Sequence, residues 1–153
     1  MLIEMEIREI QMKEDPRGAQ IVILGEKGGS REFPIFIGYF EAQALYFAAH
    51  GRRPQRPMTH DLLYNVIDGL DARLVGVCVD DLREETFHGK LMIEQPDGKQ
   101  VLIDSRPSDA IVLAVKRQTP IYVEDSVLDS VLNRGQGEDE PPGESPGGEE
   151  TEA

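Results

Sequence analysis

The fold is decided by residues 70–117, which read LDARLVGVCVDDLREETFHGKLMIEQPDGKQVLIDSRPSDAIVLAVKR. Three strand-like segments are followed by one segment with helical spacing, and these are 70–80, 86–94, 101–104 and 107–117. The sequence Pro96-Asp97-Gly98-Lys99 between the second and third segments is typical of a hairpin turn. The stretch therefore predicts a β-β-β-α unit.

The same order of elements precedes this stretch. The segments 2–12, 19–25 and 33–37 have strand character, with a slip in phase within 2–12, and 38–50 has helical spacing. A shift of 68 residues without gaps superposes the two halves and places Glu41 on Asp109. Further helices are expected at 58–67 and 126–132, with a short strand at 120–123. We expect an α+β fold with a mixed, largely antiparallel sheet, flanking helices and a duplicated β-β-β-α unit.

The composition limits the class of protein. A chain of 153 residues suits one domain with a real hydrophobic core. The single cysteine, Cys78, excludes a disulfide framework or a multi-cysteine zinc site, and its strand segment predicts a core position. The first residues contain Glu4, Glu6 and Glu9 within an apolar stretch, which is unlike a secretory signal, and no apolar run approaches membrane-spanning length. We expect a cytoplasmic protein without a membrane partner.

Negative charge is concentrated at the C-terminus. The net charge is −13, and residues 136–153 hold seven acidic and no basic residues. This Gly-, Pro- and Glu-rich stretch has no aliphatic anchor, so we expect residues 134–153 to form a disordered acidic tail. Such a tail favours solubility, and a second interpretation is competition with nucleic acid for a basic groove.

Two predicted helix starts contain residues that a helix does not require. In Arg56-Pro57-Met58-Thr59-His60-Asp61, Thr59 is expected to be the N-cap and Asp61 to favour the helix dipole, whereas His60 has no structural need. A histidine there could orient water or bind phosphate. In the second start, Asp104-Ser105-Arg106-Pro107-Ser108-Asp109, Pro107 suits the first helical position. Arg106 is then either an anion-binding group or a cation neutralised by Asp104 and Asp109. Asp109 could also accept a hydrogen bond from a free backbone N–H, as in a capping box.

Two other clusters have both structural and functional interpretations. Three arginines, Arg52, Arg53 and Arg56, exceed what a helix end needs and favour phosphate contact. By contrast, Lys116 and Arg117 suit the end of a helix. The aromatic residues of the 38–50 helix are expected to be core or interface residues more than a base-stacking platform, and an interface there would allow a homodimer.

Five motifs, taken in order, resemble those of the bifunctional nuclease (BFN) domain family. They are Phe36-Ile37-Gly38 with Glu41-Ala42, Arg56-Pro57-Met58-Thr59-His60-Asp61-Leu62, Thr86-Phe87-His88-Gly89-Lys90-Leu91, Ser105-Arg106-Pro107-Ser108-Asp109-Ala110 and Pro120-Ile121-Tyr122-Val123-Glu124. The resemblance covers residues 1–133. The family is named for plant members described as acting on both DNA and RNA, so the resemblance implies a nuclease, a hydrolase with DNase and RNase activity.

A nuclease needs an activated water and groups that hold phosphate, and many use a divalent metal. The expected catalytic residues are His60, Asp61, Asp104 and Asp109. The expected phosphate-binding residues are Arg56, Arg106, Ser108 and Thr59. Mg²⁺ or Mn²⁺, if required, would be held by Glu41, Asp104 and Asp109. The alternative function is a non-catalytic regulatory module that binds an anion or a partner.

Overall fold

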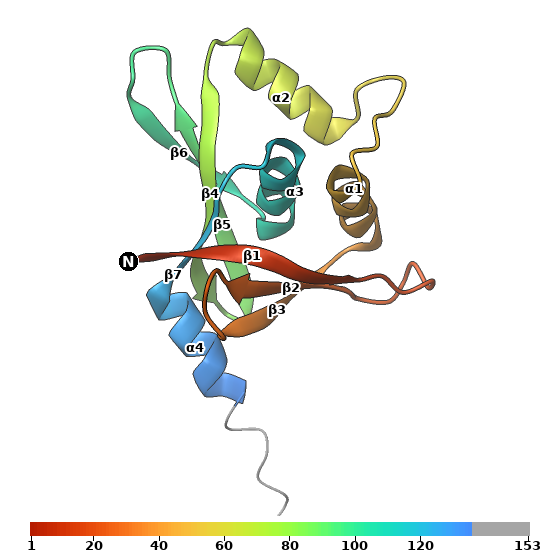
Figure 1. The fold of residues 1–153 in the computed structure, drawn as a ribbon, viewed down its shortest axis with the longest axis vertical. Helices are drawn as coiled ribbons and strands as arrows, with labels where there is room; N and C mark the ends of the chain where they lie inside the picture. The colour runs from red at the N-terminus through yellow and green to blue at the C-terminus, as the bar shows by residue number, and fades with distance from the viewer. Residues whose placement is uncertain (136–153) are drawn as a thin grey trace, which may run out of the picture.

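The computed structural model describes residues 1–135 as seven strands and four helices (Figure 1). The elements in chain order are β1 (Leu2–Gln11), β2 (Gln20–Glu26), β3 (Glu32–Ile37), α1 (Tyr39–Ala49), α2 (Thr59–Gly69), β4 (Arg73–Arg83), β5 (Thr86–Glu94), β6 (Gln100–Ser105), α3 (Pro107–Arg117), β7 (Ile121–Glu124) and α4 (Asp125–Gly135). The acidic tail expected over 134–153 lies, from residue 136 onward, outside the described residues.

All seven strands form one sheet in the order β3-β2-β1-β7-β4-β5-β6. Only the β4–β7 pair is parallel, and the other neighbouring strands are antiparallel. The expected α+β fold with a mixed, largely antiparallel sheet is therefore confirmed. Strand β7 lies between the two three-stranded halves and joins them.

The duplicated order of elements is also present in the structure. An offset of 68 residues places β3 on β6 and α1 on α3 with identical bounds. The expected strand at 70–80 is wrong at its start, because α2 extends to Gly69 and the chain then turns through Leu70 and Asp71. The backbone of Asp71 has a positive φ of 55°, so β4 begins only at Arg73.

The slip in phase within the first strand has a structural cause. The register of β1 against β2 shifts between Ile7 and Glu9, which marks a β-bulge. Such a bulge turns the following side chains to the other face of the sheet, so the alternation of apolar residues changes phase there.

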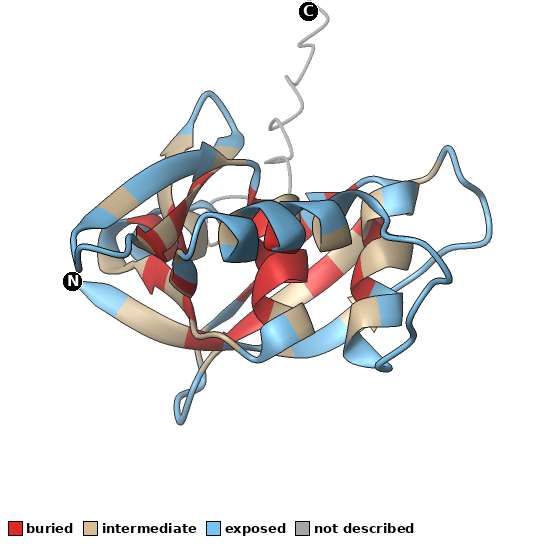
Figure 2. Ribbon diagram, turned by 90° about the horizontal axis from the view of Figure 1, so that it is seen from above, coloured by how far each residue is buried: buried red, intermediate tan, exposed pale blue. Residues whose placement is uncertain are grey.

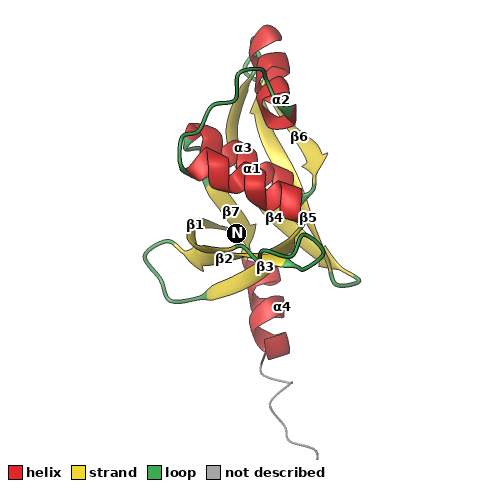
Figure 3. Ribbon diagram, turned by 90° about the vertical axis from the view of Figure 1, so that its right-hand side faces the viewer, coloured by secondary structure: helices red, strands yellow, loops and turns green. Residues whose placement is uncertain are grey.

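Helix α3 lies at the centre of the core. Its residues 110–114 are all buried, between the sheet and helices α1 and α2 (Figure 2). The Tyr64 hydroxyl of α2 donates a hydrogen bond to the Leu113 carbonyl of α3. Helices α1 and α3 lie on one side of the sheet and α4 on the other (Figures 1 and 3). Cys78 is buried on β4, as expected. Within residues 1–135, no helix has the length and apolar character needed to cross a membrane.

Candidate active site where three helices begin

Helices α1, α2 and α3 each carry a carboxylate at their third residue. These are Glu41, Asp61 and Asp109. Negative charge in the first turn is stabilised by the partial positive charge of the helix N-terminus. The same local rule therefore supplies three carboxylates, and the packing of α1 and α2 against α3 determines which side chains they meet.

A chain of contacts connects the three helix starts. The His60 Nε2 lies 2.9 Å from Asp109 Oδ1, which joins α2 to α3. The Arg106 Nε donates to Asp109 Oδ2 at 2.8 Å, and its Nη1 donates to Glu41 Oε1 at 3.3 Å, which joins α3 to α1. We call His60, Asp109, Arg106 and Glu41 the paired network.

Asp109 is the centre of the paired network because both of its carboxylate oxygens are used. Burial acts to raise the pKa of Asp109, but the hydrogen bonds from Arg106 and His60 outweigh it, so the pKa is lowered from its ordinary value of 3.8. Asp109 is consequently ionised at neutral pH. An ionised carboxylate only accepts hydrogen bonds, so the proton shared with His60 is carried by Nε2.

This arrangement selects the tautomer of His60. When the ring is neutral and Nε2 carries the proton, Nδ1 holds the basic lone pair. Among residues 1–135, the His60 ring makes no other hydrogen bond. The side chain is 15% exposed, which leaves the ring in limited contact with solvent. His60 is therefore oriented in the way that a general base requires.

Arg106 is the N-cap residue of α3 and Pro107 is its first residue, as expected. A cation at this helix end is unfavourable by itself, and two carboxylates compensate for it. We expected Asp104 and Asp109 to neutralise Arg106. Asp109 does so, but the expectation for Asp104 is wrong, because Glu41 makes the second contact. Asp109 binds side chains, so the expected capping box is not formed. The hydrogen bonds that Arg106 donates to Asp109 and Glu41 raise the pKa of Arg106, and its side chain is still 65% exposed.

Gly38, the N-cap of α1, occupies the position that matches Arg106 in the repeat. The carboxylate of Glu41 folds back over it, so a Cβ at residue 38 would collide with Glu41 Oε2. Glycine at this position therefore leaves room for the carboxylate that binds Arg106.

Asp61 belongs to a second pair beside the first. Its Oδ1 lies 2.6 Å from Lys116 Nζ, and its Oδ2 accepts the Met58 N–H at 3.0 Å. The hydrogen bond from Lys116 is the main reason that the pKa of Asp61 is lowered. The expectation that Thr59 is the N-cap is wrong by one residue, because Met58 is the N-cap and Thr59 is the first helical residue. Thr59 is exposed at the edge of this pair.

Asp104 lies apart from the other expected catalytic residues. Its Oδ1 lies 3.4 Å from Lys90 Nζ. The same Nζ also lies 3.3 Å from Asp80 Oδ2. The Asp104 side chain is 81% exposed. The reason is local, because Asp104 is on strand β6 whereas Asp109 is in the first turn of α3.

The carboxylates expected to hold Mg²⁺ or Mn²⁺ do not fit a metal site. Glu41 and Asp109 are bridged by the Arg106 guanidinium, and Asp104 contacts Lys90. In the described part of the chain, no three His, Cys, Asp or Glu side chains are grouped so that they could hold a metal ion.

The loop between α1 and α2, residues 50–58, carries Arg52, Arg53 and Arg56, and we call it the arginine loop. All three side chains are exposed. Within residues 1–135, none of the three has a carboxylate within the 4.0 Å of an ion pair. Arg52 lies over the Phe47 ring, with its guanidinium carbon 5.6 Å from the ring centroid. Ser108, by contrast, is buried against a separate hollow that Arg106 and Glu41 also line.

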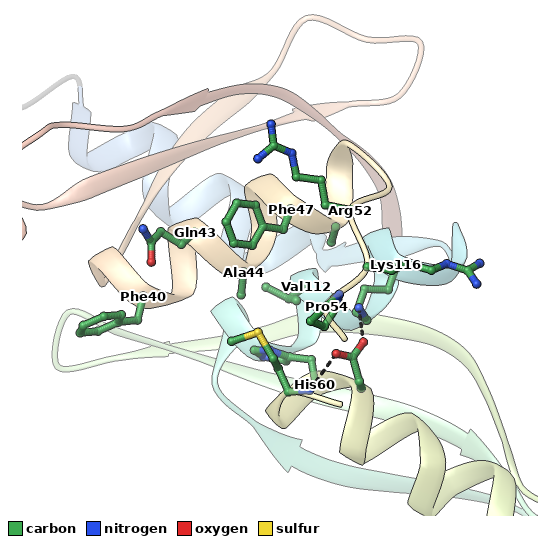
Figure 4. Close-up of a pocket in the computed structure, with 13 residues that line it drawn as sticks. Phe40, Gln43, Ala44, Phe47, Arg52, Pro54, His60, Val112 and Lys116 are labelled. Carbon is green, nitrogen blue, oxygen red and sulfur yellow. Dashed lines mark hydrogen bonds and ion pairs between the residues drawn. The ribbon is translucent and has the colours of Figure 1, made fainter. Parts of the chain in front are cut away.

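A hollow of about 320 Å³ opens beside the paired network (Figure 4). Its wall on α1 is formed by Phe40, Gln43, Ala44, Phe47 and Ala48, and α3 contributes Val112 and Lys116. His60 and Asp61 line it from α2, and Arg52, Arg53 and Pro54 line it from the arginine loop. We call this space the aromatic hollow.

The aromatic hollow includes phenylalanines that were expected to be core or interface residues. Phe40 is 77% exposed and Phe47 is 38% exposed, so neither is a core residue. A signal was available, because positions 40, 44, 47 and 48 recur on one helical face and alternate large with small residues. Lys116, interpreted as a residue suited to the helix end, also forms part of the wall and pairs with Asp61.

The fold and site define an α+β domain of two related halves, with a histidine–carboxylate–arginine network where its helices begin. The chain belongs to the bifunctional nuclease domain family, whose model matches residues 22–134. Two uncharacterized proteins of Mycobacterium tuberculosis, from strains CDC 1551 / Oshkosh and ATCC 25618 / H37Rv, are each 36% identical over 124 residues. Each of these matches spans 80% of this chain and 73% of the relative.

Proposed function

We propose that the protein is a nuclease that hydrolyses phosphodiester bonds of DNA or RNA, with His60 as the general base. The observation that carries this proposal is the 2.9 Å contact between His60 Nε2 and Asp109 Oδ1 at the wall of the aromatic hollow. Membership of the bifunctional nuclease domain family supports the class of reaction. Asp109 is a positioning residue, because it acts by holding the His60 ring and its tautomer.

The reaction follows from these groups. The Nδ1 of His60 takes a proton from a water molecule, and the water oxygen attacks phosphorus. The bond from phosphorus to the leaving oxygen breaks, and solvent supplies a proton to that oxygen. Arg106 does not line the aromatic hollow but a separate one, so its role in this reaction is to hold Asp109 through the hydrogen bond that its Nε donates.

The cations around the hollow would hold the substrate. Arg53 and Arg56 carry exposed guanidinium groups that suit phosphate oxygens. Lys116 is already paired with Asp61, so we assign it to the wall of the site and not to phosphate binding. The negative net charge of the whole chain favours local contacts with a few phosphates over non-specific binding of long nucleic acid.

The arginine loop also supports a second candidate function, a non-catalytic module that binds an anionic ligand. Unpaired guanidinium groups bind anions without any general base. The two functions differ in their dependence on His60, since a binding module loses nothing when the base is removed.

The test is cleavage of labelled single-stranded DNA and RNA by wild type, His60→Ala and His88→Ala, each with Mg²⁺, with Mn²⁺ and with EDTA. His88 is the matched control, because it lies on β5, contacts Arg83 of β4 and is not part of the paired network. We expect His60→Ala to lower kcat by about 10²- to 10⁴-fold, with His88→Ala equal to wild type and activity retained in EDTA. Equal cleavage by all three proteins would contradict the assignment of His60. No cleavage, with retained oligonucleotide binding, would favour the binding module.

A further inference from the structure

The aromatic hollow has a shape that the proposed hydrolysis alone does not require. Phe40, Ala44, Phe47 and Ala48 lie on one face of α1, at the spacing of successive helical turns. Ala44 lies between Phe40 and Phe47 on this face of the helix, and Val112 of α3 also lines the hollow. We call this apolar side of the hollow, which carries both phenyl groups and includes His60 at its margin, the apolar slot (Figure 4).

Exposure of these rings costs free energy unless something covers them. Phe40 is 77% exposed, although α1 is otherwise anchored by the buried residues Ala42 and Leu45. A hollow of about 320 Å³ is at the lower limit of small-molecule sites, which span about 300–1,000 Å³, so it suits one ring system. A flat aromatic ligand would cover the phenyl faces by stacking.

Positive charge lies directly beside the apolar slot. Arg53 and Pro54 line the aromatic hollow and also a second hollow of about 450 Å³, which Arg117 lines as well. Arg53 has no ion-pair partner among residues 1–135, whereas Arg117 is held by Asp68 at 2.6 Å. A ligand that fills the slot with a ring therefore meets an unpaired guanidinium at the slot's edge. A ring joined to a phosphate is the chemistry that matches both features.

We propose that the aromatic hollow is a base-binding subsite that takes one unpaired base of a single-stranded nucleic acid, stacked against Phe40 and Phe47, while the arginine loop holds the adjoining phosphate. This inference rests on the proposed nuclease function and adds the substrate class. In a duplex the faces of the bases are covered by stacking, and only their edges are accessible. A site that binds the face of a ring therefore selects single strands, and it tolerates different bases because each has an aromatic face.

The test is equilibrium binding, measured by fluorescence anisotropy with the full chain carrying Asp109→Asn. Asp109 does not line the aromatic hollow, so the background limits cleavage of the probe and leaves the subsite intact. The probes are a labelled single-stranded oligodeoxynucleotide, its RNA counterpart, the same DNA with abasic sites, and its duplex. The abasic strand keeps the phosphates and lacks the rings, so it separates stacking from charge.

The substitutions are Phe40→Ala, Phe47→Leu and the control Phe36→Ala. Phe40 is so exposed that its removal leaves the core intact, and Phe47→Leu keeps an apolar side chain but removes the ring. Phe36 of β3 is also an exposed phenyl group, at 64%, and it lines the separate hollow beside Arg106 and not the aromatic hollow. We expect Phe40→Ala and Phe47→Leu each to weaken binding of DNA and RNA strands by about 5- to 150-fold. Neither substitution should change binding of the abasic strand.

Several results would overturn the base-binding subsite. These are equal binding of the normal and abasic strands, equal binding of duplex and single strand, or no effect of either hollow substitution. The same loss with Phe36→Ala would also overturn it. If the wild-type protein binds single strands tightly and needs their bases, but cleaves neither DNA nor RNA, the base-binding subsite is supported and the proposed nuclease function is contradicted. The two proposals can therefore be contradicted independently. Equal affinity for DNA and RNA places recognition in the ring and phosphate, and a preference for one places it also in the sugar.

Discussion

The arginines of this protein differ in their partners, and the difference separates two regions of one site. Arg106 in the paired network contacts two carboxylates, from Asp109 and Glu41. The arginines of the arginine loop, which connects α1 to α2, have no carboxylate partner among residues 1–135. Paired side chains hold fixed positions, whereas unpaired cations remain available to an outside anion. The comparison assigns positioning and chemistry to the first region and binding of phosphates to the second.

The largest expected effect comes from changing the centre of the paired network. In Asp109→Asn, the amide donates a hydrogen bond to His60 Nε2, so the ring proton moves to Nδ1 and the basic lone pair is lost from that atom. We expect kcat to fall by about 10²-fold or more, as for wrong-tautomer variants of other histidine–carboxylate pairs. Nitrogen-15 NMR of labelled histidine reads the tautomer directly, and an unchanged Nε2–H signal would contradict the assigned role of Asp109.

The arginine loop is expected to act on binding. Replacing Arg52, Arg53 and Arg56 together by Gln should raise KM and leave kcat nearly unchanged. Each lost phosphate contact on a single strand lowers the slope of log affinity against log salt by about 0.7, so the slope should fall by up to about 2. The control is Arg73→Gln with Arg83→Gln, which removes paired surface arginines of β4. An equal loss of salt dependence in the control would remove the distinction between the two regions.

The Asp61–Lys116 pair is expected to affect stability in a pH-dependent way. Lys116 lowers the pKa of Asp61 below its ordinary value of 3.8, so the carboxylate is more acidic in the folded state. The stabilisation is therefore complete above about pH 4 and is lost as the pH falls through the folded-state pKa. At pH 7, Asp61→Asn should lower the free energy of unfolding by about 1–2 kcal/mol.

The same measurement at lower pH checks the sign. Chemical denaturation at a series of pH values should show the wild type and Asp61→Asn converging below pH 3.8. The exposed turn variant Asp97→Asn should follow the wild type throughout, because its amide oxygen still accepts the Lys99 N–H. A gap between wild type and Asp61→Asn that stays constant with pH would show that the pair contributes through packing alone.

The smallest effect is expected at the edge of the paired network. Glu41→Gln removes one contact of Arg106, whose side chain is largely exposed, and the contact with Asp109 remains. Exposed ion pairs contribute about 0–1 kcal/mol, so kcat should change by no more than about fivefold. A loss as large as that of Asp109→Asn would place Glu41 in the chemistry.

Local rules predicted most of the fold. The offset of 68 residues located both β-β-β-α halves, and the phase slip in the first strand coincides with a β-bulge that was not itself predicted. The start of β4 was wrong because Leu70 continues the apolar pattern of a strand while its backbone belongs to the turn after α2. At Leu70 the apolar pattern indicates a strand, but the backbone forms a turn. The spacing of apolar residues in the sequence reveals the pattern and not the backbone conformation.

The contacts among the candidate site residues could be predicted only in part, because they depend on packing. His60 and Asp109 were both candidates, but their pairing joins residues 49 positions apart through the contact of α2 with α3. Asp104 and Asp109 are close in sequence, yet the change from strand to helix between them separates their partners. The phenylalanines of the aromatic hollow were assigned to core or interface because an apolar residue on a helix is usually covered. Their exposure is a property of the assembled fold.

The division between the two regions is tested most directly by steady-state cleavage of one single-stranded oligonucleotide by three proteins. These are wild type, Asp109→Asn and the triple variant of Arg52, Arg53 and Arg56 to Gln. The proposed roles predict that Asp109→Asn lowers kcat with little change in KM, and that the triple variant raises KM with little change in kcat. Equal changes of kcat and KM in both variants, or wild-type kcat for Asp109→Asn, would contradict the assignment of chemistry to the paired network and binding to the arginine loop.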